Sequence, residues 1–150
     1  MRLVVLSDTH YAPAMDEALG ARRCGWADTL LQRAVHRLNR MVRPDVVVVL
    51  GDVLNDGTDD QAEGAFREVK RILDGLSMPW LIIPGNHDGP AETFYRHFPR
   101  PPAHTDIAGV RLLCFVDAEE PGYNARRTAT DVARLRSARG DGWRGPVVAL

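Results

Sequence analysis

Three short segments of the chain gather side chains of the kinds that bind metal ions. They are Asp8-Thr9-His10, Gly51-Asp52-Val53-Leu54-Asn55 and Gly85-Asn86-His87-Asp88. Carboxylate, imidazole and amide donors suit Mn, Fe or Zn, whereas iron–sulfur clusters and structural zinc sites depend on thiolates, which these segments lack. The residue types therefore predict a metal site of the oxygen and imidazole kind.

The spacing within the segments supports this interpretation. Asp8 and His10 are two residues apart, so in an extended backbone both side chains point the same way and can reach one ion. Gly51 and Gly85 allow sharp turns and a close approach of the backbone to a ligand. The carboxylate of Asp52 has two oxygens and is able to bridge two cations.

Each segment follows a short apolar run that is typical of a strand. The runs are Leu3–Leu6, Val46–Leu50 and Trp80–Ile83. Continuous runs rich in Val and Ile predict strands that are buried on both faces, as in a parallel sheet. Because the carboxyl ends of parallel strands share one edge, the three segments are expected to meet there.

Two helix-period segments separate these strands. In residues 28–42 apolar positions recur at three and four residues, and Pro44 is expected to stop that helix. In residues 59–76 a second apolar stripe follows Thr58 and Gln61, whose spacing predicts a capping box at the helix start. A strand–helix–strand–helix–strand order predicts an α/β fold with right-handed crossovers.

The pattern weakens after the third segment. We expect a short helix at 94–98, a strand at 111–116, a helix at 128–139 and a strand at 146–150. Without a linker or a repeat, residues 1–150 are interpreted as a single domain.

Composition excludes several classes of protein. The chain has 19 basic and 20 acidic residues and a net charge of -1, so no nucleic-acid or membrane partner is expected. No stretch approaches the ~18 apolar residues that a spanning helix needs. Cys24 and Cys114 are expected to be free thiols in a reducing compartment, which favours a cytoplasmic location. Trp26, Trp80 and Trp143 are interpreted as packing residues rather than as platforms for base stacking.

The three motifs in this order resemble those of the calcineurin-like metallophosphoesterases. The stretches 51–57 and 78–88 are similar to the bacterial branch that contains the class III cyclic-nucleotide phosphodiesterases. The protein-phosphatase branch differs, because it has Asp-Arg-Gly after the second motif, where this chain has Asp56-Gly57 after Asn55. That branch also usually has Glu after Asn-His, where this chain has Asp88.

The resemblance implies a role for each residue of the site and two divalent or trivalent ions, Mn, Fe or Zn. Asp8 and His10 would bind the first ion, Asp52 would bridge both, and Asn86 would bind the second ion and reach the phosphate. His87 would be the catalytic histidine that contacts the phosphate and protonates the leaving oxygen. The reaction would be in-line attack by an activated hydroxide on phosphorus.

The resemblance also implies the fold, an αββα sandwich with a mostly parallel first sheet and helices outside. Two later family motifs, a lone histidine and Gly-His-x-His, are absent from these residues. The chain is therefore interpreted as about the first three-fifths of a family domain, either a fragment or a natural short form with another source of ligands.

The leading hypothesis is a metal-dependent phosphodiesterase or phosphomonoesterase acting on a small nucleotide-like substrate. The alternatives are a catalytically inactive binding module on the same fold and a truncated inactive fragment. Nuclease activity is disfavoured because the chain has no basic stripe. The sequence leaves substrate identity, the native metal pair and the oligomeric state open.

Overall fold

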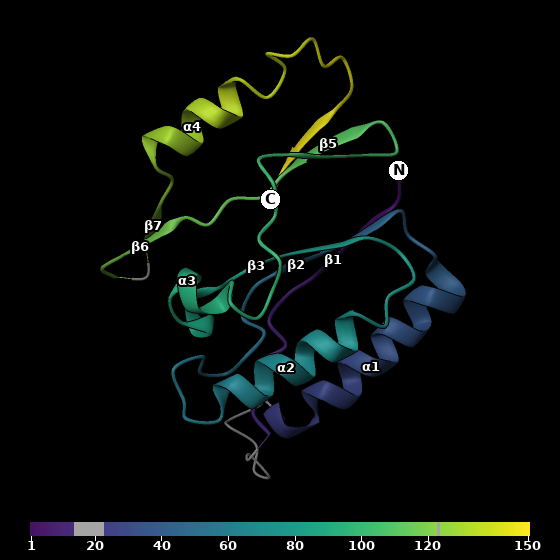
Figure 1. Cartoon of the computed structure of the whole chain (residues 1–150), viewed down its shortest axis with the longest axis vertical. Coiled ribbons are helices and arrows are strands. Elements are labelled where there is room, and N and C mark those ends of the chain that lie inside the picture. The colour runs from purple at the N-terminus through teal and green to yellow at the C-terminus, as the bar shows by residue number, and fades with distance from the viewer. Residues whose placement is uncertain (14–22, 123) are drawn as a thin grey trace. The chain divides into compact units, whose positions relative to one another are not determined.

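Three strands form a parallel sheet in the first part of the chain (Figure 1). The computed structural model describes residues 1–13, 23–122 and 124–150. Strands β1 (Leu3–Leu6), β2 (Val46–Leu50) and β3 (Trp80–Ile83) lie in the order β1-β2-β3, and all pairs are parallel. The four valines of β2 are at most 2% exposed, so this strand is covered on both faces. The prediction that all three are buried on both faces is wrong for β1, an edge strand on which Val5 is 45% exposed. The predicted strands, their bounds and their direction are confirmed.

Helices α1 (Ala27–Arg37) and α2 (Ala62–Leu73) lie side by side (Figure 1), and their apolar stripes join the core. A short 3-10 turn, Cys24–Trp26, leads into α1. The single predicted helix at 28–42 changes into a π turn at Leu38–Val42, which the period alone did not indicate. The turn ends where the amide of Arg43, in the left-handed conformation, donates to the carbonyl of Leu38 at 2.7 Å.

The predicted capping box at the start of α2 is wrong. The N-cap is Gln61, whose side chain makes no capping hydrogen bond, and the helix begins at Ala62 rather than at residue 59. The hydroxyl of Thr58 donates instead to Asp56 at 2.6 Å, and Asp59 accepts from the Gln61 amide. Two local turns thus use the polar groups that the capping interpretation assigned to the helix.

An aromatic cluster closes one end of the first core. The short helix α3 (Ala91–Phe94) brings Phe94 against Phe66 of α2, and Phe98 packs against both rings. His97 stacks on Phe66 with 5.1 Å between the ring centroids. The helix predicted at 94–98 therefore lies a few residues earlier, and its last residues form turns that complete the core.

The chain divides into two compact units, Arg2–Arg100 and a second one that contains Pro101–Leu150. The second unit has a three-stranded sheet in the order β4-β5-β8, an outlying β6-β7 hairpin and helix α4. Its elements are β4 (Thr105–Ile107), β5 (Val110–Leu113), β6 (Ala118–Glu120), β7 (Asn124–Arg126), α4 (Ala129–Arg136) and β8 (Val147–Ala149). Strands β5 and β8 confirm the strands predicted at 111–116 and 146–150 with shorter bounds, and they pair in parallel. Strand β4, which pairs with β5 antiparallel, was not predicted.

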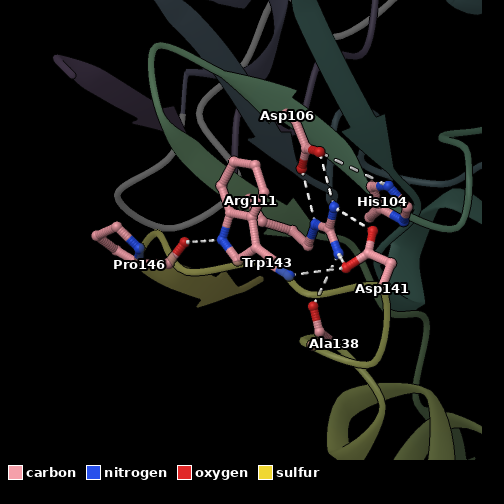
Figure 2. Close-up of polar contacts among 7 residues, drawn as sticks. All are labelled: His104, Asp106, Arg111, Ala138, Asp141, Trp143 and Pro146. Atoms are coloured by element: carbon pink, nitrogen blue, oxygen red, sulfur yellow. Dashed lines mark hydrogen bonds and ion pairs between the residues drawn. The ribbon is translucent and has the colours of Figure 1, made fainter.

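Arg111 on β5 organises the second unit (Figure 2). Its side chain is buried, and its guanidinium donates to both carboxylate oxygens of Asp106 and of Asp141, all at 2.8 Å. It also donates to the carbonyl of Ala138 and lies 4.6 Å from the ring centroid of Trp143. One arginine thereby ties the β4-β5 hairpin to the loop that leads into β8.

In the part of the chain that the structure describes, no helix is both long and apolar enough to cross a bilayer.

Candidate metal centre

Side chains from three distant segments meet at the carboxyl edge of the parallel sheet. One ligand atom from each of His10, Asp52 and His87 lies within 4.8 Å of the other two. The Nε2 atom of His10 is 3.6 Å from Oδ1 of Asp8 and 3.8 Å from Oδ2 of Asp52. Asp8 is exposed, and Asn86 is exposed at the start of the 3-10 turn Asn86–Asp88 that carries His87. The structure thus brings His10, Asp52 and His87 together with Asp8 beside His10, whereas Asn86 is placed only by its position next to His87 on the same turn.

Main-chain pairing continues past the ends of the first two strands and holds their loops together. The amide of Asp8 donates to Gly51 at 3.2 Å, and that of His10 donates to Asp52 at 2.9 Å. The amide of Tyr11 donates to Val53 at 2.9 Å and extends the same pattern. The positions of His10 and Asp52 relative to each other are therefore set by the backbone.

The backbone of this edge is strained. Asp8, His10 and Asp52 have φ values of 58°, 45° and 50°, in the left-handed region that residues with a Cβ seldom adopt. Strain of this kind gathers at ligand-binding and catalytic sites, where the surrounding structure enforces it. Three predicted ligands share it here, and Asp and His are among the residues with a Cβ that adopt this conformation most often.

Two glycines allow the second and third segments to touch. A Cβ on Gly51, which has φ 80°, would lie 2.1 Å from the amide nitrogen of Gly85. A Cβ on Gly85 would lie 2.1 Å from Oδ1 of Asp52. The close approach of a ligand to these glycines stays a prediction; in the structure the group that approaches each glycine is the other segment.

His87 is held at two points. Its amide donates to Oδ1 of Asp52 at 3.0 Å, and its Nδ1 lies 2.7 Å from the carbonyl oxygen of Asn55. A carbonyl oxygen only accepts, so Nδ1 carries the proton, and in the neutral ring Nε2 is left as the lone-pair nitrogen. The ring meets that of His10 edge-on, with 4.7 Å between centroids. Sequence reasoning missed the role of the Asn55 carbonyl, because a main-chain acceptor leaves no signal in the residue type.

Asp88 supports the site from beneath. It is fully buried, and its carboxylate accepts from the amides of Leu54 and Gly85, both at 2.9 Å. Burial raises the pKa of this carboxyl, an effect that the two amide hydrogen bonds oppose and the nearby charge of Asp52 reinforces. Asp88 therefore braces the second and third segments.

The donor set fits a metal ion. Donor atoms on one ion with bonds of ~2.1 Å lie at most ~4.2 Å apart. Nε2 of His10 is 3.6 Å from a carboxylate oxygen of Asp8 and 3.8 Å from one of Asp52, so both pairs already meet this limit. Imidazole and carboxylate together match Mn, Fe and Zn. Two hydrogen bonds are of the kind that orient side chains in metal sites: Nδ1 of His87 donates to the Asn55 carbonyl, and the His87 amide donates to Oδ1 of Asp52.

Comparisons with known proteins agree with this chemistry. Residues 1–125 match the sequence model of the family described as calcineurin-like phosphoesterase. The chain is 36% identical over 94 residues to glycerophosphodiester phosphodiesterase GpdQ of Enterobacter lignolyticus, covering 61% of this chain and 31% of that protein. It is 37% identical over 105 residues to a probable cyclic nucleotide phosphodiesterase of Rhodopseudomonas palustris, covering 68% of this chain and 34% of that protein.

The chain thus spans about a third of the length of these curated relatives. Among solved structures, that of the protein TT1561 of Thermus thermophilus is similar, with a TM-score of 0.62 over 99% of this chain and 66% of that one. At 17% identity this likeness shows the fold alone, a metallophosphoesterase-type α/β fold with a parallel sheet.

Proposed function

The chain belongs to the calcineurin-like phosphoesterase family, and from that premise we propose that it is a metal-dependent hydrolase of phosphate esters. The convergence of His10, Asp52 and His87 within 4.8 Å carries the proposal, because these side chains come from three loops that are far apart in sequence. The strain at two of them supports it further, since a site without use for these groups would have no reason to retain that backbone.

We assign the residues as follows. Asp8 and His10 would hold one ion, Asp52 would bridge it to a second, and Asn86 would bind the second ion. His10 lies within 4 Å of carboxylate oxygens of both Asp8 and Asp52, which is the arrangement that a shared ion needs. When bound, two such ions supply Lewis-acid stabilisation of the charge that develops on a phosphate during hydrolysis.

His87 is proposed to act on the phosphate. Its Nδ1 proton is engaged by the Asn55 carbonyl, so the ring is held with Nε2 as its exchangeable position. In its protonated form Nε2 can donate to a phosphate oxygen and pass a proton to the leaving alcohol. The bond from the His87 amide to Asp52 keeps this ring at a constant distance from the proposed bridging carboxylate.

Phosphodiesters are the proposed substrate class. Two similar proteins bear names of phosphodiesterases, one for glycerophosphodiesters and one for cyclic nucleotides. The near-neutral charge of the chain favours a small substrate over a polyanionic one.

Metal binding and hydrolysis test the proposal together. The chain is titrated with Mn²⁺ by calorimetry and then assayed with bis-p-nitrophenyl phosphate, with and without EDTA. We expect Mn²⁺-dependent turnover that EDTA abolishes and that Asp52→Asn reduces along with Mn²⁺ affinity. Asp74→Asn, an exposed carboxylate at the end of α2, is the matched control and should change neither. Mn²⁺ binding without turnover would favour the inactive binding module.

A further inference from the structure

A cavity beside the candidate metal centre is built by the first loop and the start of α1. Its lining residues are Asp8, Thr9, His10, Arg23, Cys24, Ala27 and Leu30. Asp8 and His10 belong to the proposed ligands, so one end of the cavity opens on the reacting centre. A phosphate held there would direct one of its ester groups toward the other end.

The far end has an unusual mixture of groups. Cys24 and Ala27 form a buried apolar floor, and Leu30 at the rim is 56% exposed. Among the described residues that line this end, Arg23 alone is charged. Within the described ranges, 1–13, 23–122 and 124–150, no carboxylate forms an ion pair with it.

Trp26 lies between the lining residues Cys24 and Ala27 in the sequence but does not itself line the cavity, and it is not the packing residue that the sequence predicted. Its side chain is 63% exposed at the end of the 3-10 turn Cys24–Trp26, and the guanidinium of Arg23 lies 5.8 Å from its ring centroid. Two large apolar side chains and a stacking cation are thus presented to solvent next to a candidate active site. Surfaces of this kind mark ligand-binding grooves.

We infer that this cavity receives the ester group of the substrate and selects one that carries an aromatic ring, as a nucleoside does, over a polyhydroxyl group such as glycerol. The inference rests on the proposed function. Apolar walls gain from burying a ring, whereas they leave the hydroxyls of glycerol without partners. The planar guanidinium of Arg23 can stack on the face of such a ring, and it already lies 5.8 Å from the ring centroid of Trp26.

Binding of simple monoesters tests the inference without reliance on turnover. Affinities of the Mn²⁺-loaded chain are measured by calorimetry for inorganic phosphate, glycerol 3-phosphate, butyl phosphate and phenyl phosphate. Half-burial of a phenyl ring predicts phenyl phosphate to bind about tenfold more tightly than glycerol 3-phosphate. Stacking on Arg23 predicts a further preference of about two- to fivefold for phenyl over butyl.

Two variants locate these preferences. Leu30→Ser should reduce the preference for phenyl over glycerol, and Arg23→Gln should remove the preference for phenyl over butyl. Met41→Ser is the matched control, because Met41 is 72% exposed on the following turn and does not line the cavity. All three positions are exposed, so the fold is expected to survive, which circular dichroism checks.

The outcomes separate the two proposals. If phosphate binds and diesters are hydrolysed but phenyl and glycerol esters bind equally, the selectivity is overturned and the proposed function stands. If the preference is present but survives both Leu30→Ser and Arg23→Gln, the cavity is the wrong location. If neither Mn²⁺ nor phosphate binds, the proposed function falls and the inference falls with it.

Discussion

Removal of the Asp88 carboxylate should destabilise the first unit by several kcal/mol, although Asp88 is assigned no contact with substrate. In Asp88→Ala the amides of Leu54 and Gly85 lose their acceptor. An unsatisfied buried amide costs about 1–3 kcal/mol. Leu54 is fully buried and Gly85 only half-buried, so the two together should cost about 2–4 kcal/mol. That is a large fraction of the ~5–15 kcal/mol by which domains are stable.

Urea denaturation followed by tryptophan fluorescence measures the loss, and hydrogen exchange shows whether protection falls at these two amides. Asp88→Asn, which keeps an acceptor for one amide only, should lose about half as much. Glu92→Ala is the control, because its exposed carboxylate makes a surface ion pair with Arg100 that is worth less than about 1 kcal/mol. A loss below about 1 kcal/mol in Asp88→Ala, with both amides still protected, would refute the bracing role.

Three further results are expected. His87→Gln should retain Mn²⁺ and lose on the order of 10²–10⁴ in kcat, measured by calorimetry and steady-state kinetics, whereas loss of Mn²⁺ would make His87 a ligand. Gly85→Ala should weaken Mn²⁺ binding because its Cβ would fall 2.1 Å from Oδ1 of Asp52, while Gly64→Ala, with nothing within 4 Å, should leave it unchanged. The hydrogen bonds from the buried guanidinium of Arg111 lower the pKa of Asp141 from 3.8 to about 2. The stability that this pair adds to the fold is therefore fully present above pH 3.8 and is lost as the pH falls toward 2. Thermal melts of Asp141→Asn should accordingly show a smaller fall in stability over that interval.

The sequence predicted the parallel sheet well because its strands are continuous apolar runs, although only β2 is covered on both faces and Val5 of β1 is exposed. Continuous apolar runs leave little choice of boundary, and β2 matches the predicted limits. Helix ends were less certain, since they depend on local competition among polar groups. The hydroxyl of Thr58 donates to Asp56 instead of capping α2. The amide of Arg43 donates to the carbonyl of Leu38, which ends the first helix in a π turn.

The second unit was harder to predict for a different reason. Strands β6 and β7 consist of exposed residues without alternation, so they carry no period that would indicate a strand. The sequence indicated Arg111 only as the first residue of a strand. Its burial depends on carboxylates 5 and 30 residues away, which is information that the fold supplies.

At the site, the residue types indicated which groups can bind metal, but not how hydrogen bonds orient those groups. The side chains that can bind metal were visible in the motifs, whereas the proton position on His87 depends on the Asn55 carbonyl. The exposure of Trp26 was also hidden, because an aromatic residue ahead of an amphipathic helix is more often a packing residue.

The backbone itself argues that the site is used. Asp8, His10 and Asp52 each occupy the left-handed region at a cost of order 1 kcal/mol, which glycine would not incur. A fold that had lost its chemistry could relieve that strain with three glycines and keep every main-chain hydrogen bond that joins the two loops. It has instead kept two carboxylates and an imidazole at these positions, braced by a buried aspartate. Carboxylate and imidazole groups held at these strained positions support the proposal that they bind an ion, and turnover then separates the enzyme from the inactive binding module.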